Sequence, residues 1–217
     1  MSHKLIIFDM DDTLITNNTW LDFNLFMGMT ADEDYRLYKQ FKAGELDYKT
    51  WTSKLVEQYK KHTLKYESEI EGELARFELA DGADLAVEAA LKLGLQTTLL
   101  TGSFSTTAQA VATELGIGSI TANTSVIYDN EGAFLDLQSQ GDEAIAKLRA
   151  LPRLCSDHNA TPEQCIAVGD GANDIPLFEA VRVSITFASA PAAVRACATH
   201  TIDNLEQLPR LLESLVT

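Results

Sequence analysis

The chain has 217 residues, 46% hydrophobic and 23% charged, a composition typical of one globular domain with room for a small insert. Its 32 acidic and 17 basic residues give a formal net charge of −15, which argues against nucleic acid or an anionic membrane as a partner. We find no apolar run approaching the roughly 20 residues of a membrane span and no signal-peptide pattern, so we expect a cytoplasmic protein.

The most informative stretch comes first. Residues 5–8 read LIIF, which predicts a strand buried on both faces, and the acidic run Asp9-Met10-Asp11-Asp12 follows directly. In an open α/β sheet, ligands bind beyond the carboxyl ends of the strands, where Asp9 and Asp11 would project. Crowded carboxylates there require a cation or a proton, although an acidic turn without chemistry also fits this stretch alone.

The segment 15–80 differs in character from the rest of the chain. It shows no convincing strand, and apolar residues recur at helical spacing. The pattern predicts an all-helical insert with helices over 20–27, 31–41, 48–62 and 68–77. Its aromatic residues could cover a substrate pocket, but we favour the simpler interpretation that they form the insert's own small core.

From residue 81 onward, strands and helices alternate. The expected strands are 95–100, 124–129, 133–137, 165–168, 182–187 and 199–202. The expected helices are 82–93, 105–115, 142–158, 190–197 and 205–216, and Pro152 should break or delay the third of these. This rhythm predicts an α/β fold with a doubly wound parallel sheet formed by 1–14 and 81–217, and a helical cap formed by 15–80.

The three cysteines, Cys155, Cys165 and Cys197, form no CxxC pair, and their number is odd. Each lies among apolar or small residues. We therefore expect reduced thiols in or near the core and neither a zinc site nor a disulfide framework.

Three of the predicted strands end in polar clusters. Asp9 and Asp11 follow the first, Thr101 and Gly102 the second, and the run 169–174, GDGAND, a later one. Because parallel strands point the same way, these clusters should converge on one edge of the sheet. Such a set suits phosphoryl transfer through an aspartyl phosphate, since a carboxylate that attacks phosphorus divides one difficult displacement into two easier ones.

Each cluster has a role in that chemistry. Asp9 suits the nucleophile, and Asp11 the acid that protonates the leaving group and then deprotonates water. Mg²⁺ would take oxygens from Asp9, Asp170 and the Asp11 backbone carbonyl. The Thr101 hydroxyl, the Gly102 N–H and the following helix N-terminus would hold phosphate. Lys147 is the candidate for completing that cradle.

The motifs FDMDDTL, LLTGS, Lys147 and VGDGAND resemble the four motifs of the haloacid dehalogenase superfamily, whose core is Rossmann-like. The helical insert after the first motif and the run AVGDGANDIPLFEA resemble its phosphoserine phosphatase branch. The resemblance covers about 4–203. It implies the roles above and adds Asp174 as a metal-site or water-holding carboxylate and Asn173 as a polar support near the phosphate.

Two departures from that branch concern the substrate. Where the phosphoserine enzymes carry a Glu for the substrate amine, this chain has Asn18, and Leu55 is the best match for their carboxylate-binding Arg. An amino-acid zwitterion would be poorly paired without both, so we expect the family chemistry without selectivity for phosphoserine. Asn17 and Asn18 are the expected substrate readers, with Trp20 beside them.

The leading hypothesis is thus an Mg²⁺-dependent phosphomonoester hydrolase that acts on a small phosphorylated metabolite, as a monomer or homodimer. A phosphotransferase or mutase would share the first half-reaction. A receiver-type signalling module would share the phosphorylated Asp, the Mg²⁺, the hydroxyl residue and the Lys. A degenerate member that binds phosphate without turnover is a further alternative.

Overall fold

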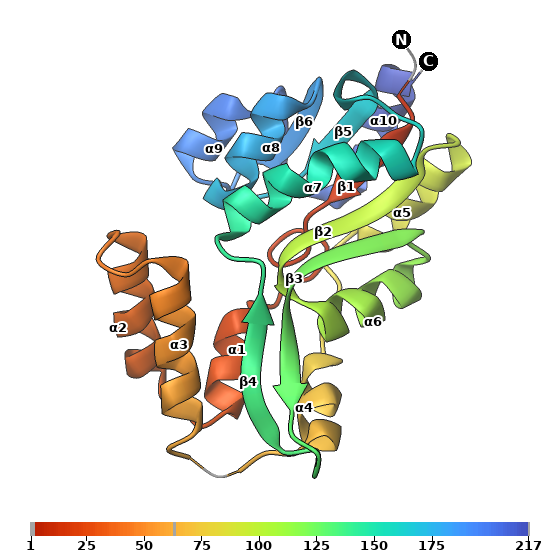
Figure 1. Cartoon of the computed structure of the whole chain (residues 1–217). Helices are drawn as coiled ribbons and strands as arrows, with labels where there is room; N and C mark the ends of the chain where they lie inside the picture. The colour runs from red at the N-terminus through yellow and green to blue at the C-terminus, as the bar shows by residue number, and fades with distance from the viewer. Residues whose placement is uncertain (1–2, 63, 217) are drawn as a thin grey trace.

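The computed structural model describes residues 3–62 and 64–216, so 1, 2 and 217 of the predicted core lie outside the described residues. Its centre is a seven-stranded sheet with the order β4-β3-β2-β1-β5-β6-β7 (Figure 1). All neighbouring strands pair in parallel except β3 and β4. The strands are β1 (Leu5–Phe8), β2 (Gln96–Phe104), β3 (Ser119–Tyr128), β4 (Phe134–Ser139), β5 (Cys165–Val168), β6 (Val183–Phe187) and β7 (His200–Ile202).

Helices cover both faces of this sheet. On one face lie α5 (Ala83–Lys92), α6 (Ser105–Leu115) and α10 (Leu208–Val216); on the other lie α7 (Glu143–Asp157), α8 (Ile175–Ala180) and α9 (Ala192–Cys197). Successive side chains of a strand point to opposite faces, so Ile6 and Phe8 of β1 join the first core and Leu5 and Ile7 the second. The LIIF strand is thus buried on both faces, as its composition predicted, and the doubly wound α/β fold is confirmed.

A smaller helical unit is inserted after β1. It contains α1 (Thr19–Phe26), α2 (Ala31–Lys42), α3 (Tyr48–Tyr59) and α4 (Glu67–Leu74). These helices share a separate hydrophobic cluster that includes Trp51 and Leu55. Phe104 of β2 and Phe134 of β4 belong to the same cluster. The outer part of the β3–β4 hairpin therefore packs with the cap helices, and Figure 1 shows the hairpin running alongside α1 and α3.

Two antiparallel chain segments connect the cap to the core. The Ala80 N–H donates to the Leu14 carbonyl at 2.9 Å, and the Thr16 N–H donates to the Glu78 carbonyl at 2.9 Å. The Asn17 side chain accepts a hydrogen bond from the Glu78 N–H at 2.7 Å and so closes the same junction from the cap side. The entry to the insert and its exit are thereby held side by side.

Several element boundaries differ from the sequence-based expectations. Strand β2 runs on to Phe104, past the predicted end at residue 100, and its register with β3 shifts between Thr101 and Phe104. The first half of β3 pairs in parallel with β2 before the second half enters the hairpin. Neither this half nor α8 was expected. The apparent loop residues 101–103 are therefore an irregular stretch of strand, the kind of bulge that often re-aims side chains near active sites.

The expected break in helix α7 is wrong. The helix continues through Pro152 as one element, Glu143–Asp157. A proline removes one hydrogen bond to the carbonyl four residues earlier, here that of Leu148. Both Pro152 and Leu148 are exposed, so this part of the helix faces solvent. The freed carbonyl can then bind water, which reduces the penalty.

All three cysteines are free thiols, as expected. Cys155 and Cys165 are buried, and Cys197 is half-buried.

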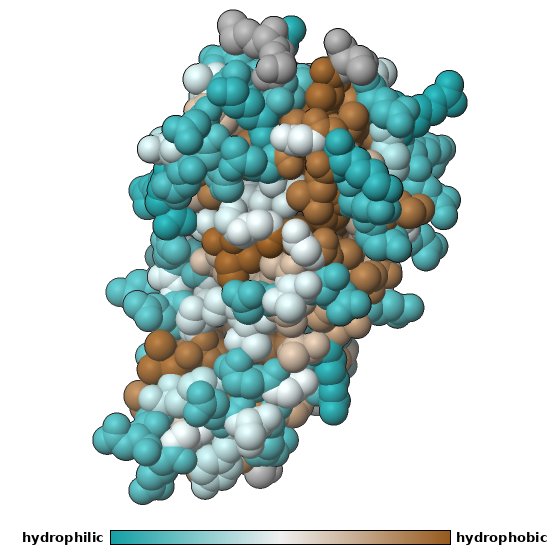
Figure 2. All heavy atoms as spheres, turned by 90° about the vertical axis from the view of Figure 1, so that its right-hand side faces the viewer, coloured by the Kyte–Doolittle hydropathy of each residue, from teal (hydrophilic) through white to brown (hydrophobic). Residues whose placement is uncertain are grey.

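Figure 2 shows apolar atoms gathered in a band on the side of the molecule that carries α5 and α6. On α5, Leu85 and Leu91 are exposed. Among the described residues, no helix has both the length and the apolar character required to cross a bilayer.

Candidate active site

The polar clusters converge at the carboxyl edge of the sheet, as predicted. Strand β1 lies between β2 and β5, and its last residue Phe8 is in register with Leu99 and Val168. The segments after these positions border a cavity of about 250 Å³ between core and cap. Its lining residues are Asp9, Asp11, Asp12, Asn18, Trp20, Leu21, Asp34, Tyr38, Phe41, Lys42, Trp51, Thr101, Gly102, Ser103, Glu143, Asp170, Gly171, Ala172 and Asn173.

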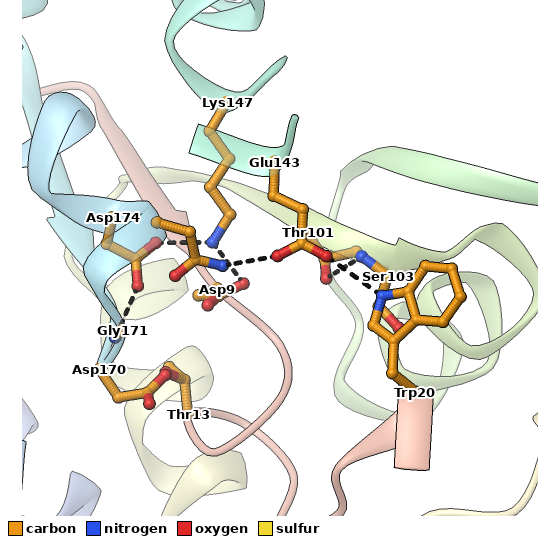
Figure 3. Close-up of polar contacts among 11 residues, drawn as sticks. Asp9, Thr13, Trp20, Thr101, Ser103, Glu143, Lys147, Asp170, Gly171 and Asp174 are labelled. Atoms are coloured by element: carbon orange, nitrogen blue, oxygen red, sulfur yellow. Dashed lines mark hydrogen bonds and ion pairs between the residues drawn. The ribbon is translucent and has the colours of Figure 1, made fainter. Parts of the chain in front are cut away.

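An ion-paired triad lies at the floor of the site (Figure 3). The Lys147 ammonium, on α7, contacts Asp9 Oδ1 at 2.7 Å and Asp174 Oδ1 at 2.6 Å, and all three side chains are buried. Burial raises the pKa of Asp9 well above its ordinary value, the charge of Asp174 raises it further, and Lys147 opposes both. Lys147 therefore carries the positive charge that lets two buried carboxylates remain close together.

Asp170 completes a group of three carboxylates. One oxygen each of Asp9, Asp170 and Asp174 lies within 4.8 Å of the other two. Asp170 Oδ1 accepts a hydrogen bond from Thr13 Oγ1 at 3.1 Å, and Asp174 Oδ2 accepts one from the Gly171 N–H at 3.0 Å. Burial, followed by the charges of Asp174 and Asp12, raises the pKa of Asp170 to about 7. Hard, clustered and mutually repelling oxygens are a donor set that fits Mg²⁺.

Asp11 is held by Thr19, the first residue of α1. Its Oδ1 accepts hydrogen bonds from the Thr19 hydroxyl and from the Thr19 N–H, the latter at 2.7 Å. Burial raises the pKa of Asp11, and the hydrogen bonds from Thr19 lower it in part. A raised pKa favours the protonated form of the carboxyl group, which is the form that a general acid needs. Its side chain does not belong to the three-carboxylate group.

The predicted phosphate ligands lie around the triad. Thr101 is buried, and its Oγ1 accepts a hydrogen bond from the Ser103 N–H at 3.0 Å, so its hydroxyl hydrogen can be donated elsewhere. Gly102 lines the cavity within the β2 irregularity. Asn173, on the short 3₁₀ turn Ala172–Asp174, also lines the cavity. These residues, with Lys147, would place hydroxyl, backbone and ammonium donors around one anion.

The predicted substrate readers separate into two groups. Asn18 and Trp20 line the cavity. Asn17 does not; its amide donates to Asp22 Oδ2 at 2.9 Å and accepts from the Glu78 N–H, so its polar groups serve the cap junction. Leu55 is buried in the cap cluster. Trp51 belongs to that cluster and Trp20 packs against it, and both also line the cavity. These aromatic residues therefore contribute both to the core of the insert and to the pocket wall.

One site residue was missed at the sequence level. Glu143, the first residue of α7, projects into the cavity, where Oε2 accepts a hydrogen bond from Asn173 Nδ2 at 3.2 Å and Oε1 accepts one from Trp20 Nε1 at 3.1 Å (Figure 3). Burial raises its pKa, Lys147 opposes that rise, and the Asp11 charge adds to it. Its spacing in the sequence could have identified it. Glu143 precedes Lys147 by four residues, so the two side chains share one face of α7.

Comparison with known proteins places this geometry in a family. A model of haloacid dehalogenase-like hydrolases matches residues 3–182. A protein of Albidiferax ferrireducens named phosphoserine phosphatase is 33% identical over 97% of this chain and 88% of its own length. One of the same name from Methanocaldococcus jannaschii is 26% identical over 87% of each chain.

Solved structures agree at the level of the fold. A phosphoserine phosphatase structure titled as a phospho-aspartyl intermediate analogue superposes with a TM-score of 0.80 at 24% identity, covering 99% of this chain and 100% of that one. A HAD family hydrolase from Salmonella enterica gives a TM-score of 0.83 at 22% identity, covering 99% of this chain and 72% of that one. The chain therefore belongs to the haloacid dehalogenase-like hydrolases, in their phosphoserine phosphatase-like branch, and is a phosphatase.

Proposed function

We propose that this phosphatase is a Mg²⁺-dependent phosphomonoester hydrolase that acts on a small phosphorylated metabolite through an aspartyl phosphate on Asp9. The observation that carries the proposal is the grouping of Asp9, Asp170 and Asp174 within 4.8 Å, with Lys147 ion-paired to two of them. An anionic nucleophile can approach an anionic phosphate only where positive charge neutralises both.

In the first half-reaction, an Asp9 carboxylate oxygen attacks phosphorus and the bond from phosphorus to the ester oxygen breaks. The Asp11 carboxyl gives its proton to the departing alkoxide, so the product leaves as an alcohol. In the second, Asp11, now a carboxylate, takes a proton from water as that water attacks phosphorus. Inorganic phosphate is released, and Asp9 and Asp11 return to their initial states.

The remaining residues bind and orient. Thr101, Gly102, Lys147 and Asn173 would donate hydrogen bonds to the non-bridging phosphate oxygens. Asp9, Asp170 and the Asp11 carbonyl would hold Mg²⁺, with Asp174 as a further ligand or as a water-holding carboxylate. When bound, the ion supplies charge neutralisation for the phosphate oxygens. The cap residues Trp20 and Trp51 would exclude bulk water from the phosphoryl group.

The test is a phosphate-release assay over a panel of phosphomonoesters, with Mg²⁺ or with EDTA. We expect release that requires the metal and is lost in Asp9→Asn, which removes the nucleophile while keeping the side chain's shape. The matched control is Asp136→Asn, an exposed aspartate on β4, which should retain wild-type turnover. Metal-independent release, or an active Asp9→Asn variant, contradicts the proposal. Transfer of phosphate to an added alcohol without release indicates the phosphotransferase alternative.

A further inference from the structure

Glu143 lies in the cavity against the phosphate-binding segment. A Cβ atom placed on Gly102 would lie 2.4 Å from the Glu143 Cδ, so the carboxylate packs directly on the glycine proposed to bind phosphate. Glu143 accepts hydrogen bonds from Asn173 of the core and from Trp20 of the cap, and Figure 3 shows its carboxylate facing the Trp20 indole. A bound phosphomonoester would therefore have a carboxylate beside its phosphoryl group or beside the first atoms of its leaving group.

The charge of Glu143 has no counterpart among the described residues. Its two hydrogen-bond donors, Asn173 and Trp20, are neutral. The nearby Lys147 ammonium is already ion-paired with Asp9 and Asp174. Glu143 is also not part of the three-carboxylate group that suits a metal. A carboxylate next to a phosphate dianion is repulsive unless a cation lies between them, and here the substrate is the component that can bring one.

The rest of the cavity also favours a cation. Four of its lining residues are aromatic: Trp20, Tyr38, Phe41 and Trp51. Aromatic ring faces attract ammonium groups, and quaternary ammonium ligands are commonly bound in aromatic cages. Asp34 adds a further carboxylate to the lining. The lining contains one side-chain cation, Lys42, and its side chain is exposed.

We propose that Glu143 binds the ammonium group of the substrate, and that the substrate class is the phosphate ester of an amino alcohol that lacks a carboxylate. This inference rests on the proposed phosphatase function. Glu143 would supply, from the core side, the negative charge that Asn18 does not supply from the cap side. A short carbon chain between phosphate and amine places the ammonium near Glu143 while the phosphate is held at Gly102. Leu55 is apolar and buried in the cap cluster, so this position offers no cation to a substrate carboxylate.

The experiment compares kcat/KM for ethanolamine phosphate with that for propyl phosphate, a neutral analogue of similar size, and for phosphoserine. In the wild-type protein we expect ethanolamine phosphate to exceed both. In Glu143→Gln, which keeps the shape and loses the charge, we expect kcat/KM for ethanolamine phosphate to fall by roughly ten- to a hundredfold, with the loss mainly in KM. Propyl phosphate should lose little or improve, because the repulsion of its phosphate is removed.

Two further variants complete the experiment. Glu143→Asp, which keeps the charge on a shorter side chain, should restore part of the amine preference. Glu163→Gln removes an exposed glutamate and should behave as wild type. Turnover of the panel without amine preference, or an unchanged preference in Glu143→Gln, overturns this inference and leaves the phosphatase function standing. A dominant phosphoserine activity that Lys42→Ala removes also overturns it. Absence of metal-dependent turnover on every ester instead contradicts the proposed function.

Discussion

The proposed division of labour between Asp9 and Asp11 rests on their different surroundings. Burial raises the pKa of Asp9, and the ammonium of Lys147, ion-paired with it at 2.7 Å, opposes that rise. Asp11 has no ion pair among the described residues and is held by Thr19, and burial raises its pKa. One carboxyl group is thus suited to attack and the other to carry a proton, as in enzymes that give two neighbouring carboxylates opposite roles.

The role of Asp11 can be separated from that of Asp9 by choice of leaving group. p-Nitrophenolate departs without needing a proton, so Asp11→Asn should still be phosphorylated by p-nitrophenyl phosphate. Hydrolysis of the intermediate should slow by about 10²- to 10⁴-fold because the base is lost. Stopped-flow absorbance should therefore show a burst of about one p-nitrophenolate per active site, followed by slow turnover. Slow turnover without a burst would show that Asp11 acts before the intermediate forms.

Glu143 gives a second prediction at the same scale, in the stability of the metal-free and substrate-free protein. Its folded-state pKa is raised, chiefly by burial, so the stability it contributes is complete below the unfolded-state pKa and is lost as pH rises through the folded-state value. Glu143→Gln cannot ionise and avoids that loss. Urea unfolding should be measured between about pH 4 and about pH 8. The free energy of unfolding of Glu143→Gln, relative to that of the wild type, should increase as pH rises. A constant difference across this range would contradict the burial of a charged Glu143.

At the scale of elements, glycines at the strand ends let side chains approach the backbone. A Cβ on Gly169, directly after β5, would lie 2.4 Å from Asp174 Oδ2. Gly169→Ala should therefore displace Asp174, weaken its ion pair with Lys147 and raise the Mg²⁺ concentration needed for activity by tenfold or more. The matched control is Gly72→Ala in α4, where a Cβ meets nothing within 4 Å and helix propensity should stabilise by about 1 kcal/mol. Equal metal dependence in the two variants would contradict the expected displacement.

The same scale shows what the sequence could predict. The sequence predicts strands β1 and β5 with their full lengths because each is a short apolar run that ends abruptly, β1 before Asp9 and β5 before Gly169. The end of β2 was placed too early because Thr101, Gly102 and Ser103 have loop-like composition, whereas the pairing with β3 continues through them. Pairing between parallel strands depends on residues far apart in the sequence, so local composition predicts it poorly.

The site residues likewise differ in how well the sequence predicts their positions. Residues in contiguous motifs, such as Asp9 and Asp174, could be placed together because the sheet topology fixes where strand ends meet. Glu143 could not be placed in the site in this way, because its position in the cavity depends on a contact with the cap, the hydrogen bond from Trp20. The sharing of one hydrophobic cluster by the cap helices and the β3–β4 hairpin is likewise a tertiary property. Sequence patterns therefore predicted the grouping of the carboxylates better than the part of the cavity lining that depends on the cap.

On the scale of the whole molecule, the cavity is formed where the helical insert meets the carboxyl edge of the sheet. The insert's helices share a hydrophobic cluster with the β3–β4 hairpin, and antiparallel segments at Leu14–Thr16 and 78–80 join the insert to the core. Contacts such as Trp20 to Glu143 cross the interface between them. Such an arrangement lets the core hold the reacting groups while the cap determines which leaving group fits.

Metal binding should stabilise the molecule as a whole, because the unfolded chain has no preformed site. At a Mg²⁺ concentration about a hundredfold above its Kd, the gain is about 2.7 kcal/mol. Differential scanning fluorimetry should show a rise in Tm with Mg²⁺ that EDTA reverses. Asp170→Asn keeps an acceptor for Thr13 but loses the charge, and should abolish the rise. An equal Mg²⁺-dependent rise in wild type and Asp170→Asn would contradict a site at Asp170.

The most direct test is to identify the phosphorylated atom. Asp11→Asn, mixed with p-nitrophenyl phosphate and Mg²⁺ and quenched in acid, should accumulate the intermediate, since its hydrolysis is slowed. Peptide mass spectrometry should then find the mass of one phosphoryl group on the peptide that contains Asp9, and fragmentation should assign it to Asp9. The Asp9→Asn variant should show none. A phosphoryl group on another residue, or none during a burst of p-nitrophenolate release, would contradict catalysis through Asp9.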